Sequence, residues 1–400
     1  SDKLRVLFSG PVGTRSGYGS HARDLVYALI NIDKYDVYIL PQKWGNTPEN
    51  ALSSNNERDK KIMDRLIKAE DQKIPFDISF QVTVPNEFQK WAKYNIGVTA
   101  GFEATLVPND WIQGANNADL VLFSSVHGLN SVANSKFDMH NEQKQKVGEL
   151  QLTTKSEVLF EGVDTEVYKK TTTFSEQLVK EVSKIKESFC FLFVGHWLQG
   201  GLGEDRKDTA MLVKTFLESF KDIKNPPALI MKTSGADFSI LSKVKAHITF
   251  THGEGFGRPL LEASLSGKPV IASAWSGHVD FLNKNNATLL TGQLTTVPKA
   301  AFPKQFLVEG QQWFTVNYSV ANSILKDIFK KYKKYALPAK KLAIYNKSKF
   351  SLKAMQDKLE KILDENIPNF PKQVKLKLPK LKKAAQKAPT VKLPKLKKVN

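Results

Sequence analysis

The chain has 400 residues, which predicts two or three domains, and its content of 41% hydrophobic and 25% charged residues excludes a fibrous or wholly disordered protein. A single cysteine, Cys190, excludes an intrachain disulfide and any cysteine-cluster metal site. The longest purely apolar run, Phe189–Val194, is far shorter than the ~20 residues that a membrane-spanning helix needs. The first residues lead straight into an apolar strand pattern, so we expect no secretory signal and a cytoplasmic location, or the host cytoplasm if the protein is viral.

The charge is strongly basic and unevenly distributed. Lys and Arg number 59 against 40 Asp and Glu, and residues 371–400 contain eleven lysines and no acidic residue. The heptapeptide Lys-Leu-Pro-Lys-Leu-Lys-Lys occurs at 377–383 and again at 392–398. Its prolines prevent a continuous helix and its charge prevents a core, which predicts a low-complexity tail over 369–400. Such a tail favours a polyanionic partner, either nucleic acid or an anionic membrane, or only solubilises a disordered end.

The N-terminal part predicts a parallel, doubly wound α/β domain over residues 1–166. An apolar strand at 4–10 is followed by a glycine-rich loop and a helix at 21–29, which is the opening of a βαβ unit. Strands and helices then alternate, as in sheets whose strands are buried on both faces. The further strands of this domain are predicted at 35–40, 76–80, 94–99, 118–123 and 156–160.

After a polar, lysine-rich stretch the same pattern begins again, which predicts a second α/β domain over 167–345. Its predicted strands are 189–194, 228–232, 247–251 and 269–272, with helices at 209–220 and 259–266. A last helix at 350–367 defines a segment, 346–368, that we expect to pack back on the first domain. Two such domains imply a cleft between them, with ligands at the carboxyl ends of the strands.

The segment from His252 to Glu262 contains the most informative motif. A strand ends there, a glycine loop turns, and a helix begins at Pro259, whose free N–H groups favour an anion. Seven residues separate Glu254 from Glu262. A carboxylate accepts two hydrogen bonds in a geometry that suits a sugar diol. The glycines alone are equally compatible with an ordinary turn between a strand and a helix.

This Glu-x7-Glu spacing, within Glu-Gly-Phe-Gly-x-Pro-x-x-Glu-Ala, resembles the signature of retaining GT-B glycosyltransferases of family 4. The resemblance covers roughly residues 4–365. Other segments agree in order with the family's hinge, its diphosphate-binding pair, the strand after the signature helix and a first-domain segment of one branch: Leu159–Tyr168, Arg206-Lys207, Lys268–Asp280 and Gly101–Trp111. The implied fold is two Rossmann-like domains facing a cleft.

The resemblance also implies a nucleotide-sugar donor bound mainly by the second domain. Glu262 would hold the ribose and Glu254 the transferred sugar, and the loop residues Gly255, Phe256 and Gly257 would complete the donor site. Arg206 and Lys207 would neutralise the leaving diphosphate, because fixed cations stabilise a developing negative charge. They would replace a divalent metal, so we expect a metal-independent transferase with no cofactor beyond its co-substrate.

In the first domain the resemblance places Gly17 and Gly19 opposite the donor, and His21 and Glu103 toward the acceptor. Glycine lets backbone N–H groups approach a phosphate or sugar, although both glycines could simply make a tight turn. Glu103 is the catalytic candidate here, because a carboxylate could orient a sugar hydroxyl or take the acceptor proton. The alternative is a structural glutamate bonded to a loop.

The chain departs from the family pattern at three places. His196 stands where an arginine is common, and His252 where a serine is common. The chain between Lys232 and the Glu254 loop looks short, so a helix could be missing there. None of the seven histidines has metal-ligand spacing, and we expect His127 and His278 to be structural.

The sequence leaves the acceptor open. We expect a hexosyl- or pentosyltransferase, with a modified base in DNA as the favoured acceptor. Such a base would have to flip out of the duplex to reach the cleft. The alternative is a glycolipid or polysaccharide acceptor at an anionic membrane, contacted peripherally. A further alternative is a non-catalytic protein that binds sugars or polyanions on the same fold.

Overall fold

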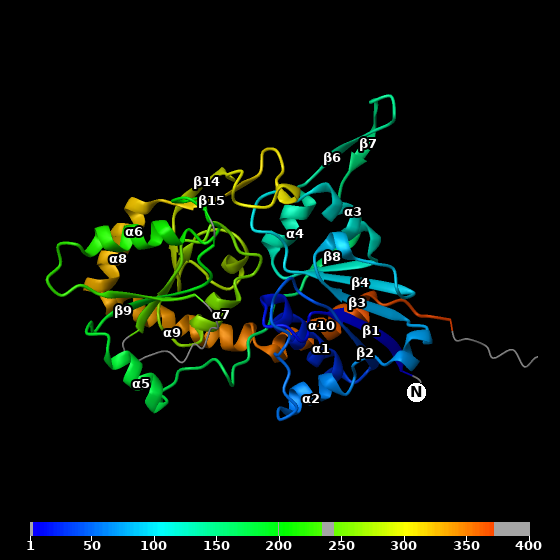
Figure 1. Ribbon diagram of the computed structural model, residues 1–400, viewed down its shortest axis with the longest axis horizontal. Helices are drawn as coiled ribbons and strands as arrows, with labels where there is room; N and C mark the ends of the chain where they lie inside the picture. The colour runs from blue at the N-terminus through cyan, green and yellow to red at the C-terminus, as the bar shows by residue number, and fades with distance from the viewer. Residues whose placement is uncertain (1–2, 199, 234–243, 372–400) are drawn as a thin grey trace, which may run out of the picture. The chain divides into compact units, whose positions relative to one another are not determined.

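The computed structural model describes residues 3–198, 200–233 and 244–371, and it contains two parallel-sheet, Rossmann-like α/β domains (Figure 1). The predicted fold class is therefore confirmed. The first sheet has the strand order β2-β1-β3-β4-β5-β8, with every neighbouring pair parallel. Its strands are β1 Leu4–Gly10, β2 Tyr35–Pro41, β3 Ile78–Val82, β4 Tyr94–Thr99, β5 Leu120–Phe123 and β8 Lys155–Val158.

The central strands of this sheet are rich in apolar residues, because helices and loops cover both faces, whereas the edge strand β8 is the polar sequence Lys-Ser-Glu-Val. Every residue of β3 and β5 is buried. In register, Val6 of β1 lies between Val37 of β2 and Ile78 of β3. The helices and 3-10 turns of this region are α1 Gly17–Ile32, α2 Glu57–Met63, α3 Asn109–Asn117, α4 Val126–Ala133, η1 Ala69–Lys73 and η2 Pro85–Glu87.

The second sheet is also parallel and has the order β10-β9-β11-β12-β13. Its strands are β9 Cys190–Val194, β10 Ala228–Lys232, β11 Val244–Ile248, β12 Val270–Ser273 and β13 Thr288–Leu290. The helices associated with it are α5 Glu176–Ser183, α6 Thr209–Phe220 and α7 Arg258–Ser264, with the 3-10 turn η3 Gly277–Asp280.

The strand predicted at 247–251 lies three residues earlier in the chain. The last backbone hydrogen bond from this segment to β12 is from Thr249 N–H to the Ile271 carbonyl at 2.9 Å, and beyond it the Ser273 hydroxyl donates a hydrogen bond to the Thr251 carbonyl at 2.7 Å. The side chain thus satisfies a polar group that a longer strand would have paired. The expectation of a missing helix between Lys232 and the Glu254 loop falls largely on 234–243, which lie outside the described residues.

A hairpin that the sequence did not reveal joins the two domains. It consists of β14 Gly292–Thr296 and β15 Gln312–Val316, with the turn η4 Lys304–Phe306 in its connection. Gln312 accepts a backbone hydrogen bond from Thr105 at 2.8 Å, and the Phe302 ring lies 5.0 Å from the Phe102 ring. The hairpin connection therefore fixes the second domain against the first. A separate hairpin, β6 Phe137–His140 with β7 Lys146–Leu150, belongs to the first half of the chain.

Three helices complete the described chain: α8 Tyr318–Lys330, α9 Tyr332–Lys349 and α10 Leu352–Asn366. The helix α10 lies beside α1 (Figure 1), where Lys34 Nζ is 2.9 Å from Glu360 Oε1 and 3.0 Å from Asp364 Oδ2. The terminal part of the chain thus returns to the first sheet's helical layer. The lysine-rich tail beyond residue 371 lies outside the described residues.

Over the described ranges, no helix is both long enough and apolar enough to cross a membrane.

Candidate functional site

A cavity of about 660 Å³ opens where β9 and β10 end and where α1 and α7 begin. Its volume lies within the range of small-molecule and cofactor sites. Among the described residues that line it, Glu262 is the one acidic side chain. Six lining side chains are cationic: Arg15, Arg23, Arg206, Lys207, Lys232 and Arg258. Such a lining concentrates positive potential and suits a polyanionic ligand.

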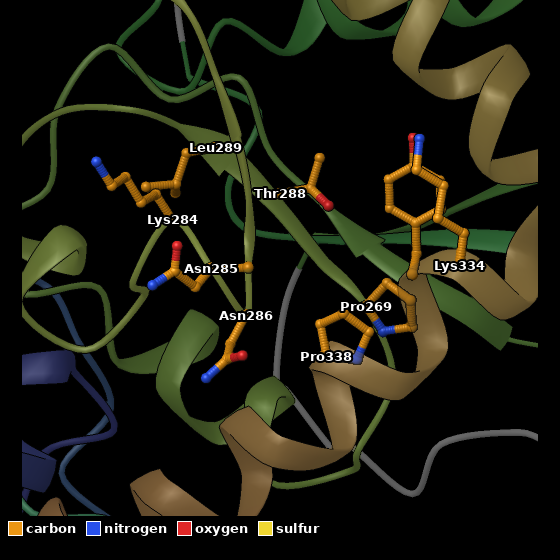
Figure 2. A pocket seen from close by; sticks show the side chains of 10 residues that line it. Pro269, Lys284, Asn285, Asn286, Thr288, Leu289, Lys334 and Pro338 are labelled. Atoms are coloured by element: carbon orange, nitrogen blue, oxygen red, sulfur yellow. The ribbon is translucent and has the colours of Figure 1, made fainter.

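A second cavity, of about 310 Å³, lies elsewhere on the second domain (Figure 2). Figure 2 shows Lys284, Asn285 and Asn286, from the loop before β13, on one side, and Lys334 and Pro338 of α9 on the other. None of the sequence-predicted site residues lines it. We therefore take the larger cavity as the candidate functional site.

Beside the larger cavity, two cations and one carboxylate of the second domain meet one carboxylate of the first domain. Lys207 Nζ contacts Glu254 Oε1 directly. Arg206 Nη1 lies 3.6 Å from Glu254 Oε2 and 3.4 Å from Glu103 Oε1. Arg206 also donates a hydrogen bond to the Gly253 carbonyl at 3.3 Å. The structure thus brings together all four residues that the sequence nominated as catalytic.

The electrostatics of this cluster favour an ionised Glu254. Burial would raise the pKa of the Glu254 carboxyl, but Lys207 and Arg206 outweigh that effect and hold the pKa at about 2. Burial lowers the pKa of Lys207, and Glu254 opposes the lowering. A carboxylate has about four acceptor positions, so Glu254 can bind both cations and still accept a hydrogen bond from a hydroxyl group.

The glycines around Glu254 allow the two domains to approach closely. A Cβ atom on Gly253 would lie 2.0 Å from the Glu103 carbonyl oxygen, and one on Gly255 would lie 2.5 Å from the Ala100 carbonyl oxygen. Gly257 has φ of +94° immediately before α7, a conformation that favours glycine. The Phe256 ring is buried 5.0 Å from the Phe281 ring, within the core. Gly255, Phe256 and Gly257 therefore shape the loop, and none of them lines the cavity.

Glu262 lies on α7 and faces the cavity. The Tyr168 hydroxyl is hydrogen-bonded to it, and Arg258 Nη2 is 3.9 Å from its Oε1. Burial raises the pKa of Glu262 to about 7, although Arg258 favours the charged form. This carboxyl therefore titrates near neutral pH, unlike Glu254, which lies eight positions earlier in the loop.

Arg258 lines the cavity, and the sequence did not point to it. It begins α7, and its guanidinium bridges Asp24 of α1 at 3.0 Å and Glu161 at 3.2 Å. Arg58 also contacts Asp24. The cluster joins the signature helix to the first domain. The only sequence signal was the arginine at the variable position of the Glu-Gly-Phe-Gly-x-Pro motif, and nothing local indicated its partners.

The glycine loop before α1 places its residues differently. Gly17 lines the cavity, and a Cβ atom added there would have no described neighbour within 4 Å. Gly19 lies inside the turn, where a Cβ would be 2.4 Å from the Thr14 carbonyl oxygen. His21 is buried away from the cavity lining, and neither ring nitrogen has a hydrogen-bond partner among the described residues. Burial lowers the pKa of His21, which favours the neutral imidazole.

The other nominated histidines have distinct surroundings. His196 lines the cavity in the place where the resemblance suggested an arginine. His252 is held by the Phe314 carbonyl at 2.7 Å and the Gly203 carbonyl at 3.0 Å, and it stacks on Trp313. His127 and His278 bond the carbonyls of Phe102 and Ser273 at 2.8 Å and 2.6 Å. Within residues 3–198, 200–233 and 244–371, no cluster of three His, Cys, Asp or Glu side chains is placed to hold a metal ion.

No protein-family model and no curated protein matches the chain. Solved structures match it across nearly its whole length. HepE of Anabaena, in complex with UDP and glucose, is 14% identical, with a TM-score of 0.55 over 90% of this chain and 100% of that one. A glycosyltransferase from Rickettsia africae is 15% identical, with a TM-score of 0.57 over 92% and 100%. Sucrose-phosphate synthase from Thermosynechococcus elongatus is 12% identical, with a TM-score of 0.55 over 91% and 99%. At these identities the likeness establishes the GT-B fold.

Proposed function

We propose that this protein is a glycosyltransferase that moves a sugar from a nucleotide-sugar donor to an acceptor. The observation that carries the proposal is the cation-lined cavity of about 660 Å³, which has the two-carboxylate, two-cation cluster at its border. Several solved structures with this fold, HepE among them, hold UDP or a UDP-sugar. The proposed location is cytoplasmic.

In this proposal each of the site residues contacts a different part of the donor or the acceptor. Glu262 accepts hydrogen bonds from the ribose, and the backbone at Gly17 faces the phosphates or the sugar. Arg206 and Lys207 neutralise the diphosphate as the bond to the sugar breaks, since preorganised cations stabilise charge that develops in the transition state. Glu254 holds the transferred sugar and also keeps Lys207 in place. Glu103, the partner of Arg206, orients the acceptor or takes its proton.

We further propose that transfer retains the anomeric configuration, by attack on the same face that the leaving group occupies, as the resemblance to family 4 implies. Retention could also arise through a covalent intermediate on a carboxylate. Glu254 does not favour that route, because its pKa of about 2 and its contact with Lys207 make it a weak nucleophile. The test is incubation with a panel of nucleotide sugars, with the anomeric configuration of the product read by NMR. A product of inverted configuration would contradict the proposed resemblance to the retaining family 4, but it would not contradict the proposed donor-binding residues.

For the acceptor we propose a modified base in DNA, on the basis of the net charge of +19 and the lysine-rich tail. The alternative is a glycolipid or polysaccharide at an anionic membrane. Mass spectrometry of DNA, lipid and glycan acceptors after incubation with each donor distinguishes these. Absence of both transfer and donor hydrolysis across the panel would favour a non-catalytic binding protein.

Replacing Glu262 with glutamine is expected to weaken donor binding by about 10- to 150-fold, because a charge-assisted hydrogen bond contributes ~1.5–3 kcal/mol. Burial raises the pKa of Glu262 to about 7, so the charged form is lost as pH falls below that value. Donor affinity should therefore fall below neutral pH in the parent protein and stay flat in the variant. Isothermal titration calorimetry at several pH values measures both. Glu218→Gln, on the exposed side of α6, is the matched control; equal affinities in all three proteins would refute the ribose role.

Chelation with EDTA is expected to leave activity largely intact. The physical reason is that Arg206 and Lys207 already supply positive charge at the site proposed for the diphosphate. Initial rates are compared before and after chelation, and after addition of manganese. Loss of activity that manganese restores would place the protein in a metal-dependent mechanistic class.

A further inference from the structure

The helix α9, Tyr332–Lys349, has an unusual composition for a helix on the surface of a globular domain. It contains six lysines and no acidic residue in 18 positions. One face packs inward: Ala339, Leu342 and Asn346 are buried, and the Asn346 side chain donates hydrogen bonds to Ser264 and to the Phe281 carbonyl at 2.9 Å and 3.2 Å. The helix is therefore fixed to the second domain, and its opposite face is exposed.

That opposite face carries large apolar side chains. Leu337 is 61% exposed, Ile344 is 73% exposed and Tyr345 is 47% exposed. Residues seven and eight positions apart lie on one side of a helix, so the three side chains form a single strip, with Lys341 between them. We call these four residues the α9 outer face. Isolated exposed apolar residues are ordinary, whereas a strip on one helix is typical of an interaction surface.

Further lysines flank the α9 outer face on both sides. Like Lys341 within it, the residues Lys333, Lys340, Lys347 and Lys349 form no ion pair with any described residue, so their charge is not neutralised within the described part of the chain. Lys334 pairs with Asp327 at 3.2 Å. The cavity of Figure 2 adds Lys284 opposite Lys334 (Figure 2).

The positive region extends beyond α9. Gly267 lies close to Lys340, since a Cβ there would be 3.9 Å from Lys340 Cγ. The next residue, Lys268, has its pKa lowered to about 8, first by burial and then by the nearby charges of Lys245 and Lys170. The surface beside α9 thus gathers further cations.

We propose that the α9 outer face docks on an anionic lipid bilayer. Interfacial helices combine an apolar strip that enters the headgroup region with lysines that reach the lipid phosphates, and α9 presents both. Lysine stems can lie along the apolar layer with their charges at the phosphates. A nucleic acid surface would use the lysines and would leave Leu337 and Ile344 in water. The proposal is independent of the proposed function and of the terminal tail.

The test uses the full chain, so that the tail contributes equally to every variant. Sedimentation with phosphatidylcholine vesicles, with and without phosphatidylserine, should show binding only when phosphatidylserine is present. Leu337→Ser/Ile344→Ser keeps every charge, and its affinity for the vesicles should fall by at least about tenfold because the apolar strip is lost. Lys333→Gln/Lys341→Gln should also weaken binding and reduce its dependence on salt. The matched control, Leu217→Ser/Val167→Ser, removes two similarly exposed apolar side chains elsewhere and should bind as the parent does.

A second readout places the helix at the bilayer. Ile344→Cys, labelled with a polarity-sensitive fluorophore, should shift to shorter wavelength only with anionic vesicles; Cys190 is buried and remains unlabelled in the folded protein. Unchanged vesicle binding by Leu337→Ser/Ile344→Ser would overturn the proposal, as would no vesicle binding by the parent. Weaker binding of that variant to duplex DNA, without any effect on vesicles, would assign the face to nucleic acid and overturn it equally.

Discussion

Replacing Lys207 with methionine is expected to lower turnover by roughly 10²–10³-fold, the range seen when one preorganised group that stabilises a transition-state charge is removed. Lys207 lines the cation-lined cavity, where its half-buried side chain contacts Glu254. In the proposed reaction the charge on the diphosphate grows as the bond to the sugar breaks, so the loss should be larger for kcat than for donor affinity. Steady-state kinetics and calorimetric donor titration measure the two quantities separately.

The same substitution leaves Glu254 without its closest cation, so stability must be followed in parallel. Removing one partner of a buried ion pair is destabilising because the remaining charge stays desolvated. Lys207→Met/Glu254→Gln, in which both charges are removed, should unfold at a higher temperature than Lys207→Met. Lys214→Met, in an exposed pair with Glu218, is the matched control for loss of a lysine. Equal losses in kcat and in donor affinity for Lys207→Met would contradict the assignment to the leaving group.

Replacing Arg258 with methionine is expected to lower the free energy of unfolding by about 3–5 kcal/mol. Its guanidinium is the shared partner of Asp24 at 3.0 Å and Glu161 at 3.2 Å, and these carboxylates come from the first domain and from the segment after β8. Without Arg258, the carboxylates of Asp24, Glu161 and Glu262 would lie near one another with less positive charge to offset their repulsion. Unfolding in guanidinium chloride, followed by circular dichroism, measures the change.

Two further variants separate the ion cluster from a general effect of charge. Arg258→Lys keeps the charge but lacks the planar fork that reaches two carboxylates at once, so its loss should be intermediate. Lys34→Met removes a cation, between α1 and β2, that also contacts two carboxylates, Glu360 and Asp364 of α10, on the exposed surface. Its effect should be much smaller, because solvent screens exposed pairs. A comparable loss in Arg258→Met and Lys34→Met would contradict a role for the buried cluster.

The sequence predicted the alternation of strands and helices in both domains, because those signals are local. Buried parallel strands appear as short apolar runs, as at 6–8 within β1 and at Cys190–Val194, and Pro259 marks the first turn of α7. The resemblance to family 4 also implied Arg206, Lys207, Glu254 and Glu103 as site residues, which the structure brings together. That selection came from a resemblance, since charged residues far apart in a chain carry no local sign that they will meet.

Only the tertiary structure decided the partners and the orientations. Asp24 and Arg258 pair across 234 positions, and no periodicity relates them. His21 was expected to face an acceptor, but the helix position alone could not show that its ring would be buried. The 292–316 hairpin and the exposed strip on α9 were equally hidden, because hydrophobic patterning shows that a side chain is apolar and does not show which neighbour covers it. Burial is set by contacts between distant segments, and these form only when the chain has folded.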